Sequence, residues 1–360
     1  MEYADYKKLK YKFAENEEYK NIIADRIKNS VVLPLSAKNG ESIRFVRCEE
    51  IDKLISEIES VYQKAEVDPV KFITDEAYST CTIEGARSTI ADTVKISKGK
   101  EPSNHSEKMI KNNINAIEFV LNKDFTFDEN GVLDLWKVLS NDAVDNFDIQ
   151  GDKYRIDDVV VADSMGNISF YAPAAEKIED MMKKLFEFVC SNDELNSFVK
   201  AVIIHYYFVY IHHFCDGNGR CARLLLQNYL IESGLEKFRG ISISTGVLKN
   251  KSGYYRALED SENDYNDITF IIIFYLETIL DVLYQACEGF GYNERHLDMS
   301  NRQKQVIEYL RKNKGNIITE EIYSKRYNVD IEIAKKELWE LVEAKILTST
   351  TDERTEYRAN

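Results

Sequence analysis

Several features that mark other protein classes are missing from this 360-residue sequence. Its first residues lack the apolar core of a signal peptide, and the longest apolar run, Ile268–Leu276, is too short to span a bilayer and predicts a buried helix. Only four prolines interrupt the chain, so helical periodicity dominates. The six cysteines have no CxxC spacing, and we interpret them as free thiols in a reducing cytoplasm.

A positive net charge is also missing. The formal charge is -15, so the chain as a whole is not expected to attract nucleic acid or an anionic membrane nonspecifically. What the sequence does contain is 44% hydrophobic residues and 22 tyrosines, enough to fill a substantial core. Its length is sufficient for two or three domains. These properties predict a globular, mainly α-helical protein.

Patterns along the chain predict four segments. Residues 1–65 are expected to form an N-terminal helical segment that ends in an amphipathic helix. Residues 66–290 are expected to form a helical core, with one β-hairpin where the pattern becomes alternating. A polar, glycine-containing linker is expected at 291–299. The sequence pattern of residues 300–360 predicts three short helices and a closing hairpin.

The stretch IHHFCDGNGRCARL concentrates groups suited to phosphate chemistry. Gly217–Gly219 forms a turn before a helical pattern, and backbone N–H groups at such a place can cradle an anion. Arg220 and Arg223 are three residues apart, so both side chains can flank one polyanion. Asp216 could hold Mg²⁺ against phosphate oxygens, and His212 could accept a proton from an attacking hydroxyl.

Other interpretations of this stretch remain open on residue types alone. A DGNG sequence is usually a surface turn, and arginine pairs on helices are usually solvated. His212 and His213 could also join Asp216 in a metal site, although HExxH is missing and no further His or Cys stands at a ligand spacing. The P-loop pattern GxxxxGK[ST] does not occur. The residue types by themselves favour phosphate binding by a small margin.

The order and spacing of the residues carry more information. HHFCDGNGRCAR resembles the signature of the Fic family, H-P-F-x-[DE]-G-N-G-R-x-x-R, at every position except His213, which replaces the proline. The resemblance implies transfer of AMP from Mg·ATP to a Tyr, Thr or Ser hydroxyl of a protein. By resemblance, His212 is the general base, Asp216 the Mg²⁺ ligand, and Arg220 and Arg223 the phosphate clamps. The residues that the resemblance places at ATP are Asp216, Gly217, Asn218, Gly219, Arg220, Cys221, Ala222, Arg223, Tyr254, Tyr255, Val159, Val160, Val161 and Ala162.

An inhibitory element is predicted upstream of the signature. STCTIEGA is similar to the family motif [ST]-x-x-x-E-[GN], with Thr80, Glu84 and Gly85 in place. The alternative is an ordinary helix end with a glycine cap. Because an intact signature follows, we interpret residues 70–85 as an inhibitory helix in which Glu84 pairs with Arg223.

Two further elements follow from the resemblance. The expected hairpin at 154–173, with strands at 159–161 and 168–171, resembles the family's flap, which aligns a target segment by strand pairing. Tyr254 and Tyr255 are expected to pack on the adenine or ribose, although core packing is the usual role of isolated tyrosines. Asn263 is a weaker candidate, because the corresponding asparagine of some relatives would align at Glu262.

The remaining candidates near the signature are expected to be structural. His205 should be hydrogen-bonded in the core, and Cys215 and Cys221 should be inert thiols. The tail, residues 300–360, resembles a winged helix, but it carries 12 Lys and Arg against 11 Asp and Glu. That balance suits a contact with protein at least as well as a contact with DNA.

The sequence thus predicts a mainly α protein, with a Fic-type helical core, a hairpin flap and a small winged-helix-like domain. We expect an autoinhibited adenylyltransferase that uses ATP and Mg²⁺ on a target protein, with self-modification and homodimer formation left open. One rival is removal of AMP from a modified protein, with Glu84 assisting water. Phosphate transfer is disfavoured by Gly217 and Arg220, since relatives with that activity end their motif A-N-K-x. Another rival is a nucleotide-sensing regulator whose tail binds DNA.

Overall fold

A computed structural model describes most of the chain. The described residues are 3–14, 16–144, 147–162, 168–263, 265–287, 299–312, 316–343, 346–351 and 355–359. They fall into two compact units, the first made of residues 1–63 and 67–282 and the second of residues 64–66 and 283–360. Among the described residues, no helix combines the length and apolarity needed to cross a bilayer.

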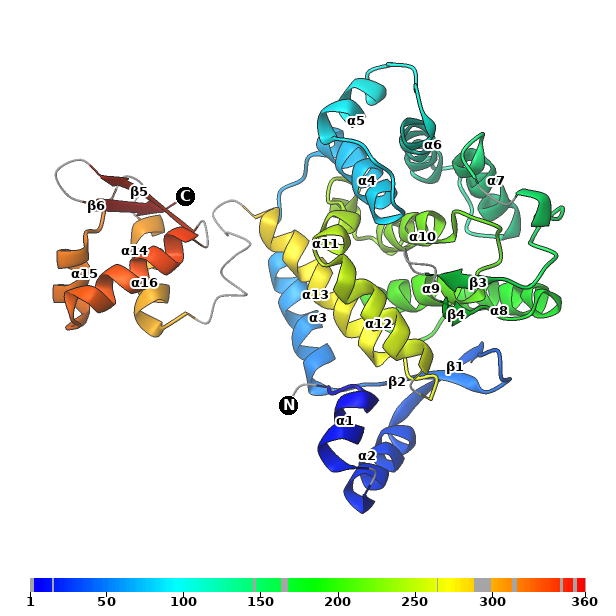
Figure 1. Ribbon diagram of the computed structural model, residues 1–360, viewed down its shortest axis with the longest axis horizontal. Helices are drawn as coiled ribbons and strands as arrows, with labels where there is room; N and C mark the ends of the chain where they lie inside the picture. Colours follow the sequence, from blue (N-terminus) through cyan, green and yellow to red (C-terminus); the bar gives the residue numbers. More distant parts are fainter. Residues whose placement is uncertain are drawn as a thin grey trace. The chain divides into compact units, whose positions relative to one another are not determined.

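Helices dominate the chain up to residue 285, as the sequence predicts (Figure 1). The α-helices are α1 (Tyr6–Phe13), α2 (Glu17–Lys28), α3 (Glu49–Tyr62), α4 (Pro69–Ile83), α5 (Ile90–Ser97), α6 (His105–Val120), α7 (Glu129–Ser140), α8 (Ile178–Cys190), α9 (Ser197–Ile211), α10 (Asn218–Glu232), α11 (Ile243–Lys249), α12 (Lys251–Asn263) and α13 (Thr269–Gln285). Three short 3-10 helices are η1 (Phe147–Ile149), η2 (Ala175–Lys177) and η3 (Glu236–Arg239). The apolar run predicted as a buried helix lies in α13 except for its first residue, Ile268, which precedes the helix. Ile268, Ile271 and Leu276 are all fully buried.

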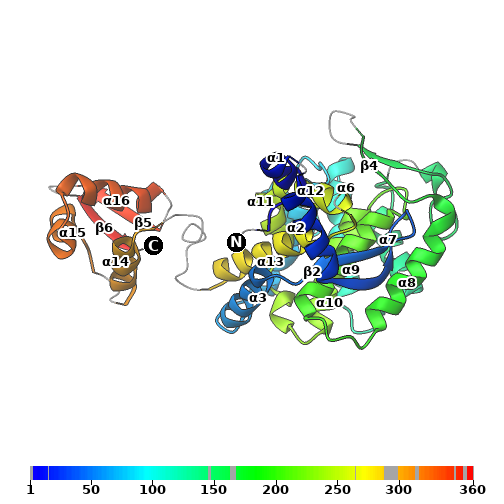
Figure 2. The ribbon, with the colours of Figure 1, turned by 90° about the horizontal axis from the view of Figure 1, so that it is seen from below.

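The core of the first unit is built around α9 and α10, which lie against each other (Figures 1 and 2). The sequence of α9, SFVKAVIIHYYFVYI, is apolar on all sides, which is typical of a helix enclosed by others. The helix α10 is nearly as buried, and its buried residues include Arg220 and Arg223. Charged groups in such a setting need local partners or a ligand. The loop 212–217, which joins the two helices, is therefore held in a rigid frame.

The prediction that residues 1–65 are helical is wrong in one part. β1 (Ser30–Ser36) and β2 (Ser42–Val46) form an antiparallel hairpin between α2 and α3. Leu33 and Leu35 alternate with exposed residues and are buried, which is the period of a strand rather than a helix. The predicted amphipathic helix is confirmed as α3. The helices α1 and α2 place Tyr6, Leu9 and Ile23 against Phe270 of α13.

The predicted flap hairpin is present. β3 (Val160–Ala162) and β4 (Ile168–Tyr171) pair antiparallel, with Val160 opposite Tyr171. The residues between the two strands, 163–167, lie outside the described part of the chain. Among the described strands, β3 pairs only with β4, so its other edge carries no strand.

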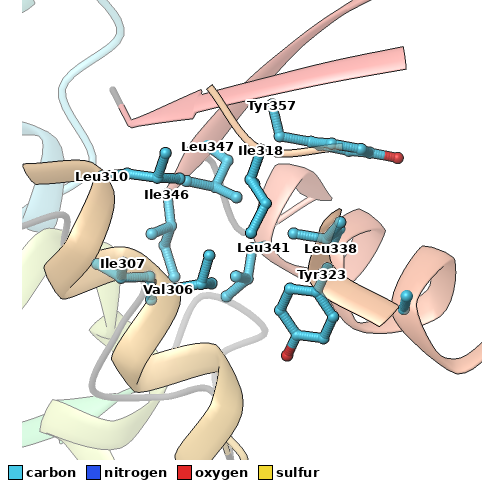
Figure 3. Close-up of a cluster of buried hydrophobic side chains, with 11 residues drawn as sticks. Val306, Ile307, Leu310, Ile318, Tyr323, Leu338, Leu341, Ile346, Leu347 and Tyr357 are labelled. Carbon is cyan, nitrogen blue, oxygen red and sulfur yellow. The ribbon is translucent and has the colours of Figure 1, made fainter. Parts of the chain in front are cut away.

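The tail contains the elements that its sequence predicts. They are α14 (Asn301–Lys312), α15 (Glu320–Tyr327), α16 (Ile331–Glu343), β5 (Leu347–Thr351) and β6 (Thr355–Ala359). An additional backbone pairing joins Ile318 to Tyr357. Figure 3 shows the hydrophobic core of this unit, in which Val306, Leu338 and Leu341 are completely buried. The winged-helix assignment stays a prediction, and nearly all of the predicted linker at 291–299 lies outside the described residues.

Candidate active site

The loop between α9 and α10 is shaped by its own residues. α9 ends at Ile211, and His212 adopts a left-handed conformation with φ 50° and ψ 51°. Gly217, with φ 83°, precedes the first residue of α10, where a left-handed backbone favours glycine. The buried Asn218 side chain closes the loop, because its amide donates to the Phe214 carbonyl at 2.8 Å and its oxygen accepts from the Phe214 N–H at 3.0 Å.

The contacts of His212 leave one ring nitrogen available as a base. Its Nδ1 lies 3.3 Å from the carbonyl oxygen of Val209. A carbonyl can only accept, so Nδ1 carries the proton and Nε2 keeps its lone pair. Burial lowers the pKa of His212, and the positive charge of Arg155 lowers it further. The imidazole is therefore neutral at neutral pH, the form that can accept a proton.

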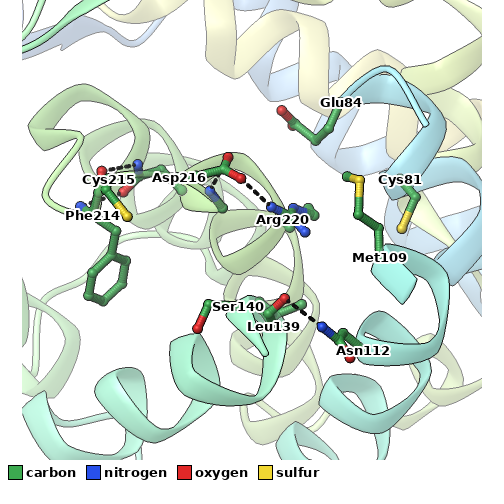
Figure 4. Close-up of polar contacts among 12 residues, drawn as sticks. Cys81, Glu84, Met109, Asn112, Leu139, Ser140, Phe214, Cys215, Asp216 and Arg220 are labelled. Carbon is green, nitrogen blue, oxygen red and sulfur yellow. Dashed lines mark hydrogen bonds and ion pairs between the residues drawn. The ribbon is translucent and has the colours of Figure 1, made fainter. Parts of the chain in front are cut away.

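Asp216 and Arg220 form the first charged pair of the site (Figure 4). Nη2 of Arg220 donates to Oδ2 of Asp216 at 3.0 Å, and Oδ1 accepts from the Gly217 N–H at 2.5 Å. Arg220 is completely buried, yet its Nε and Nη1 have no hydrogen-bond partner in the described part of the chain. The Asp216 side chain is 37% exposed. The pair thus presents unused cationic donors and a carboxylate that solvent can reach.

Arg223 and Glu84 form the second pair. Nη2 of Arg223 donates to Oε1 of Glu84 at 2.7 Å, while Nε donates to the Thr80 hydroxyl at 2.8 Å. Burial acts to raise the pKa of Glu84, but the charge and hydrogen bond of Arg223 outweigh it and hold that pKa below its usual range. Glu84 is the C-terminal cap of α4, and it extends toward the loop that carries Asp216 (Figure 4). The predicted pairing of Glu84 with Arg223 is present in the structure.

The donor set of the site fits a polyanion with a bound cation. Nη1 of Arg223 also has no partner among the described residues, so both arginines keep free donors in a buried setting. A side chain at Gly219 would collide with Oε1 of Glu84 and crowd Arg223. No cluster of three or more His, Cys, Asp or Glu suited to a metal occurs in the described ranges. Mg²⁺ binds readily to one carboxylate plus phosphate oxygens, which is what Asp216 can offer.

His213, which stands where the signature has proline, is buried among aromatic rings. Its ring packs edge-on against Tyr154 and Phe208, and neither of its nitrogens has a partner in the described structure. A residue that precedes proline is driven toward extended ψ values. His212 instead has ψ 51°. The replacement therefore allows the left-handed turn that His212 adopts.

The two tyrosines predicted to contact the nucleotide lie in different environments. Tyr254 is only 2% exposed, and its hydroxyl lies 3.3 Å from Nε2 of His205 in the core. Tyr255 is 44% exposed, and its hydroxyl donates to the Ile83 carbonyl at 3.4 Å, beside Glu84. Core packing thus accounts for Tyr254, and the exposed ring of Tyr255 is the one that a ligand can reach. The expectation that His205 is hydrogen-bonded in the core is confirmed.

The other candidates contribute less to the geometry of the site. Burial raises the pKa of the Cys215 thiol, and it raises that of Cys221 to about 12, so neither is a thiolate at neutral pH. A nucleotide contact of residues 159–162 stays a prediction.

Sequence patterns did not identify Arg155 or Trp136. The Trp136 indole donates to the Asp216 carbonyl at 2.9 Å, and no local motif indicates such a long-range contact.

Comparison with known proteins agrees with this geometry. The profile of the Fic/DOC family matches residues 126–230, a span that includes the flap and the loop 212–217. "Protein adenylyltransferase Fic" of Nematostella vectensis is 36% identical over 88 residues, which cover 24% of this chain and 19% of that protein. "Probable protein adenylyltransferase aq_aa38" of Aquifex aeolicus (strain VF5) is 28% identical over 109 residues, 30% of each chain. The chain thus spans less than a third of the length of these curated relatives.

A solved structure extends the likeness of fold. The crystal structure of a Fic family protein from Desulfovibrio desulfuricans G20 superposes with a TM-score of 0.60 at 18% identity and covers 88% of this chain and 97% of its own. At that identity the match shows the fold alone. The family match therefore identifies residues 126–230 as similar to the Fic/DOC family, and the superposition shows that the fold is that of a Fic family protein.

Proposed function

We propose that this protein transfers AMP from Mg·ATP to a hydroxyl side chain of a target protein, and that Glu84 restrains the activity. The names of both curated relatives, which include "protein adenylyltransferase", support this reaction. The observation that carries the proposal is the buried, unpartnered state of three guanidinium nitrogens, Nε and Nη1 of Arg220 and Nη1 of Arg223. Buried cationic donors without partners are costly unless a ligand satisfies them. A triphosphate beside the Gly217–Gly219 turn would do so.

The residues of the loop divide the chemistry between them. Nε2 of His212 takes the proton of the target hydroxyl, whose oxygen forms a bond to the α-phosphorus. The bond from that phosphorus to the β-phosphate bridging oxygen breaks, and pyrophosphate leaves. Arg220 and the N–H groups at the start of α10 stabilise the negative charge that develops on the phosphate. Mg²⁺, held by Asp216, would supply charge neutralisation when bound.

Glu84 would restrain this reaction by occupying Arg223. A guanidinium that already donates to Glu84 and Thr80 has less capacity left for the terminal phosphate. ATP bound under those conditions would be poorly aligned with the attacking hydroxyl, and misalignment of about 1 Å can cost on the order of 10²-fold in rate. An extended segment of the target would align with the flap hairpin by strand pairing.

Parallel incubations with α-labelled and γ-labelled ATP test the reaction. Label should pass to protein, including this chain, from α-labelled ATP alone, and more strongly for Glu84→Gly than for the natural sequence. Transfer from γ-labelled ATP would mean phosphate transfer instead. Loss of label from a pre-modified protein, without any gain, would favour removal of AMP. A salt-sensitive shift of duplex DNA without any labelling would favour a DNA-binding regulator.

A further inference from the structure

A buried arginine outside the family signature connects the flap to the candidate base. Arg155 lies just before β3 and is 2% exposed. Its Nε donates to the His212 carbonyl at 2.7 Å, Nη1 to the Asp157 carbonyl at 2.5 Å and Nη2 to the Pro173 carbonyl at 2.5 Å. Its backbone N–H donates to the His213 carbonyl at 2.9 Å. One side chain thus contacts three separate backbone positions.

These positions belong to two parts of the site. Asp157 and Pro173 lie on the two stems of the flap, one before β3 and the other after β4. His212 is the cap of α9, in a left-handed conformation that a residue with a side chain adopts only when its surroundings enforce it. The guanidinium therefore fixes the two stems to each other and fixes both to the backbone of His212.

The way in which Arg155 is buried argues for a specific role. In the described structure its guanidinium donates to backbone carbonyls alone, and no carboxylate is among its hydrogen-bond partners. Burial lowers the pKa of Arg155, while the more distant charge of Asp158 acts in the opposite direction. Burying a cation without a direct counter-ion is unfavourable, and an apolar side chain would fill the space at lower cost. What an apolar residue cannot do is hold three carbonyl groups in one plane.

We propose that Arg155 is a positioning residue that sets His212 and the flap in register, so that a hydroxyl presented by the flap arrives at the base. The inference rests on the proposed function. In the described structure no hydrogen bond joins Arg155 to Arg220, Arg223 or the Gly217–Gly219 turn, which are assigned to the phosphates. Its loss should therefore lower kcat and leave the KM for Mg·ATP nearly unchanged.

Two substitutions separate its geometry from its charge, each made together with Glu84→Gly so that activity is measurable. Arg155→Lys keeps a positive charge but cannot reach three carbonyls, and Arg155→Gln loses the charge as well. Both should reduce the kcat of pyrophosphate release from Mg·ATP by at least about tenfold, with about 10²-fold as the scale for a misplaced base. Binding of Mg·ADP, measured by calorimetry, should stay within twofold of the parent.

The pH profile adds a readout that general destabilisation would not change. In the Glu84→Gly background, the charged groups that act on His212 are Arg155 and Asp216. A positive charge lowers the pKa of an imidazole, so Arg155→Gln should move the acidic limb of kcat to higher pH. Arg155→Lys keeps the positive charge, so the acidic limb of the pH profile should stay in place while kcat falls.

Lys200→Gln is the matched control. Lys200, in the first turn of α9, is also buried, but its amine contacts the Ser191 carbonyl and Asp193. These two residues lie between α8 and α9 and are remote in sequence from His212. The Lys200→Gln substitution should lower thermal stability without altering kcat or its pH profile. Arg155 variants with kcat within twofold of the parent, or with parallel losses of kcat and Mg·ADP binding, would overturn the inference. If the Glu84→Gly parent itself releases no pyrophosphate, the proposed function fails instead.

Discussion

Glu84 pairs with Arg223 from the C-terminal end of α4, where a carboxylate is electrostatically unfavourable. It caps the C-terminus of α4, where the helix macrodipole is negative and disfavours an acid. The 2.7 Å contact with Arg223 compensates for that position and keeps the carboxylate ionised. A glutamate that only ended the helix would gain nothing by standing there, so the pairing itself is the feature to test.

Glu84→Gly should raise AMP transfer by at least about tenfold. A hydrogen bond to a charged group contributes about 1.5–3 kcal/mol, and 1.36 kcal/mol corresponds to about tenfold in rate. Initial rates of labelling at saturating Mg·α-ATP measure the change. Glu232→Gly is the control, because Glu232 ends α10 in an exposed pair with Arg239 at 3.9 Å. Equal stimulation by both substitutions would show that helix ends in general, and not Glu84, limit the rate.

Thr80→Val should also raise the rate of AMP transfer, by about two- to tenfold, which is less than the effect of Glu84→Gly. The Thr80 hydroxyl accepts from Nε of Arg223, and valine keeps the volume while it removes the acceptor, at about 1 kcal/mol. The control is Thr82→Val on the same helix, since the Thr82 hydroxyl donates only to the Tyr78 carbonyl. A lower rate for Thr80→Val than for Thr82→Val would contradict a restraining role for Thr80.

The restraint should persist into mildly acidic solution. The pKa of Glu84 is depressed in the folded protein, so its pairing is fully present above the ordinary carboxyl pKa of about 4.3 and is lost only as pH falls through the lower folded value. The ratio of the Glu84→Gly rate to the rate of the natural sequence should therefore not fall between pH 8 and pH 5. Glu84 raises the pKa of His212, so its removal lets the base form of His212 persist to lower pH and can only increase the ratio. A ratio that collapses between pH 6 and pH 5 would show that Glu84 titrates in that range.

His212→Ala should reduce transfer by roughly 10²–10⁴-fold, the usual range for a general base. Because its pKa is lowered by burial, the base form is present at neutral pH, and the unsubstituted protein should lose activity only below the ordinary histidine pKa of about 6.5. Mg·ADP affinity should hardly change, since His212 is not assigned to the phosphates. His105→Ala, which removes an exposed histidine at the start of α6, should be neutral. Near-normal transfer by His212→Ala would exclude it as the base.

A chain that ends at residue 296 should stay soluble and keep whatever self-modification the full chain shows. The tail has its own buried cluster, and Arg302 pairs with Glu337 inside that unit at 2.5 Å. Removing it should therefore leave the catalytic unit intact, as judged by its melting temperature and labelling rate. Precipitation of the shortened chain, at a concentration where the full chain is soluble, would show that the two units share packing.

Most of the signature residues are close together in the sequence, and such contacts can be predicted from spacing. The groups from His212 to Arg223 occupy one loop and one helix turn, so their spacing alone predicts that they meet. The hairpin at Ser30–Val46 was visible as alternating Leu33 and Leu35 followed by an Asn39-Gly40 turn, a strong hairpin signal that the helical prediction for 1–65 overlooked.

Arg155 could not be found in this way. Its partners are backbone carbonyls at His212, Asp157 and Pro173, and carbonyls are the same for every residue type. No spacing of side chains along the sequence encodes such a contact. The difference between Tyr254, in the core, and its exposed neighbour Tyr255 has a similar origin, since it depends on which face of α12 the fold covers.

The contact between α4 and α10 has a consequence for how the protein responds to its own abundance. Glu84 and Arg223 belong to one chain and one compact unit, so their encounter is intramolecular. A tethered group behaves as though present at millimolar or higher effective concentration, whatever the amount of protein in solution. Dilution therefore leaves the pair closed, and synthesis of more protein does not tighten it. Release has to come from something that competes for Arg223 or displaces the end of α4 within the same molecule.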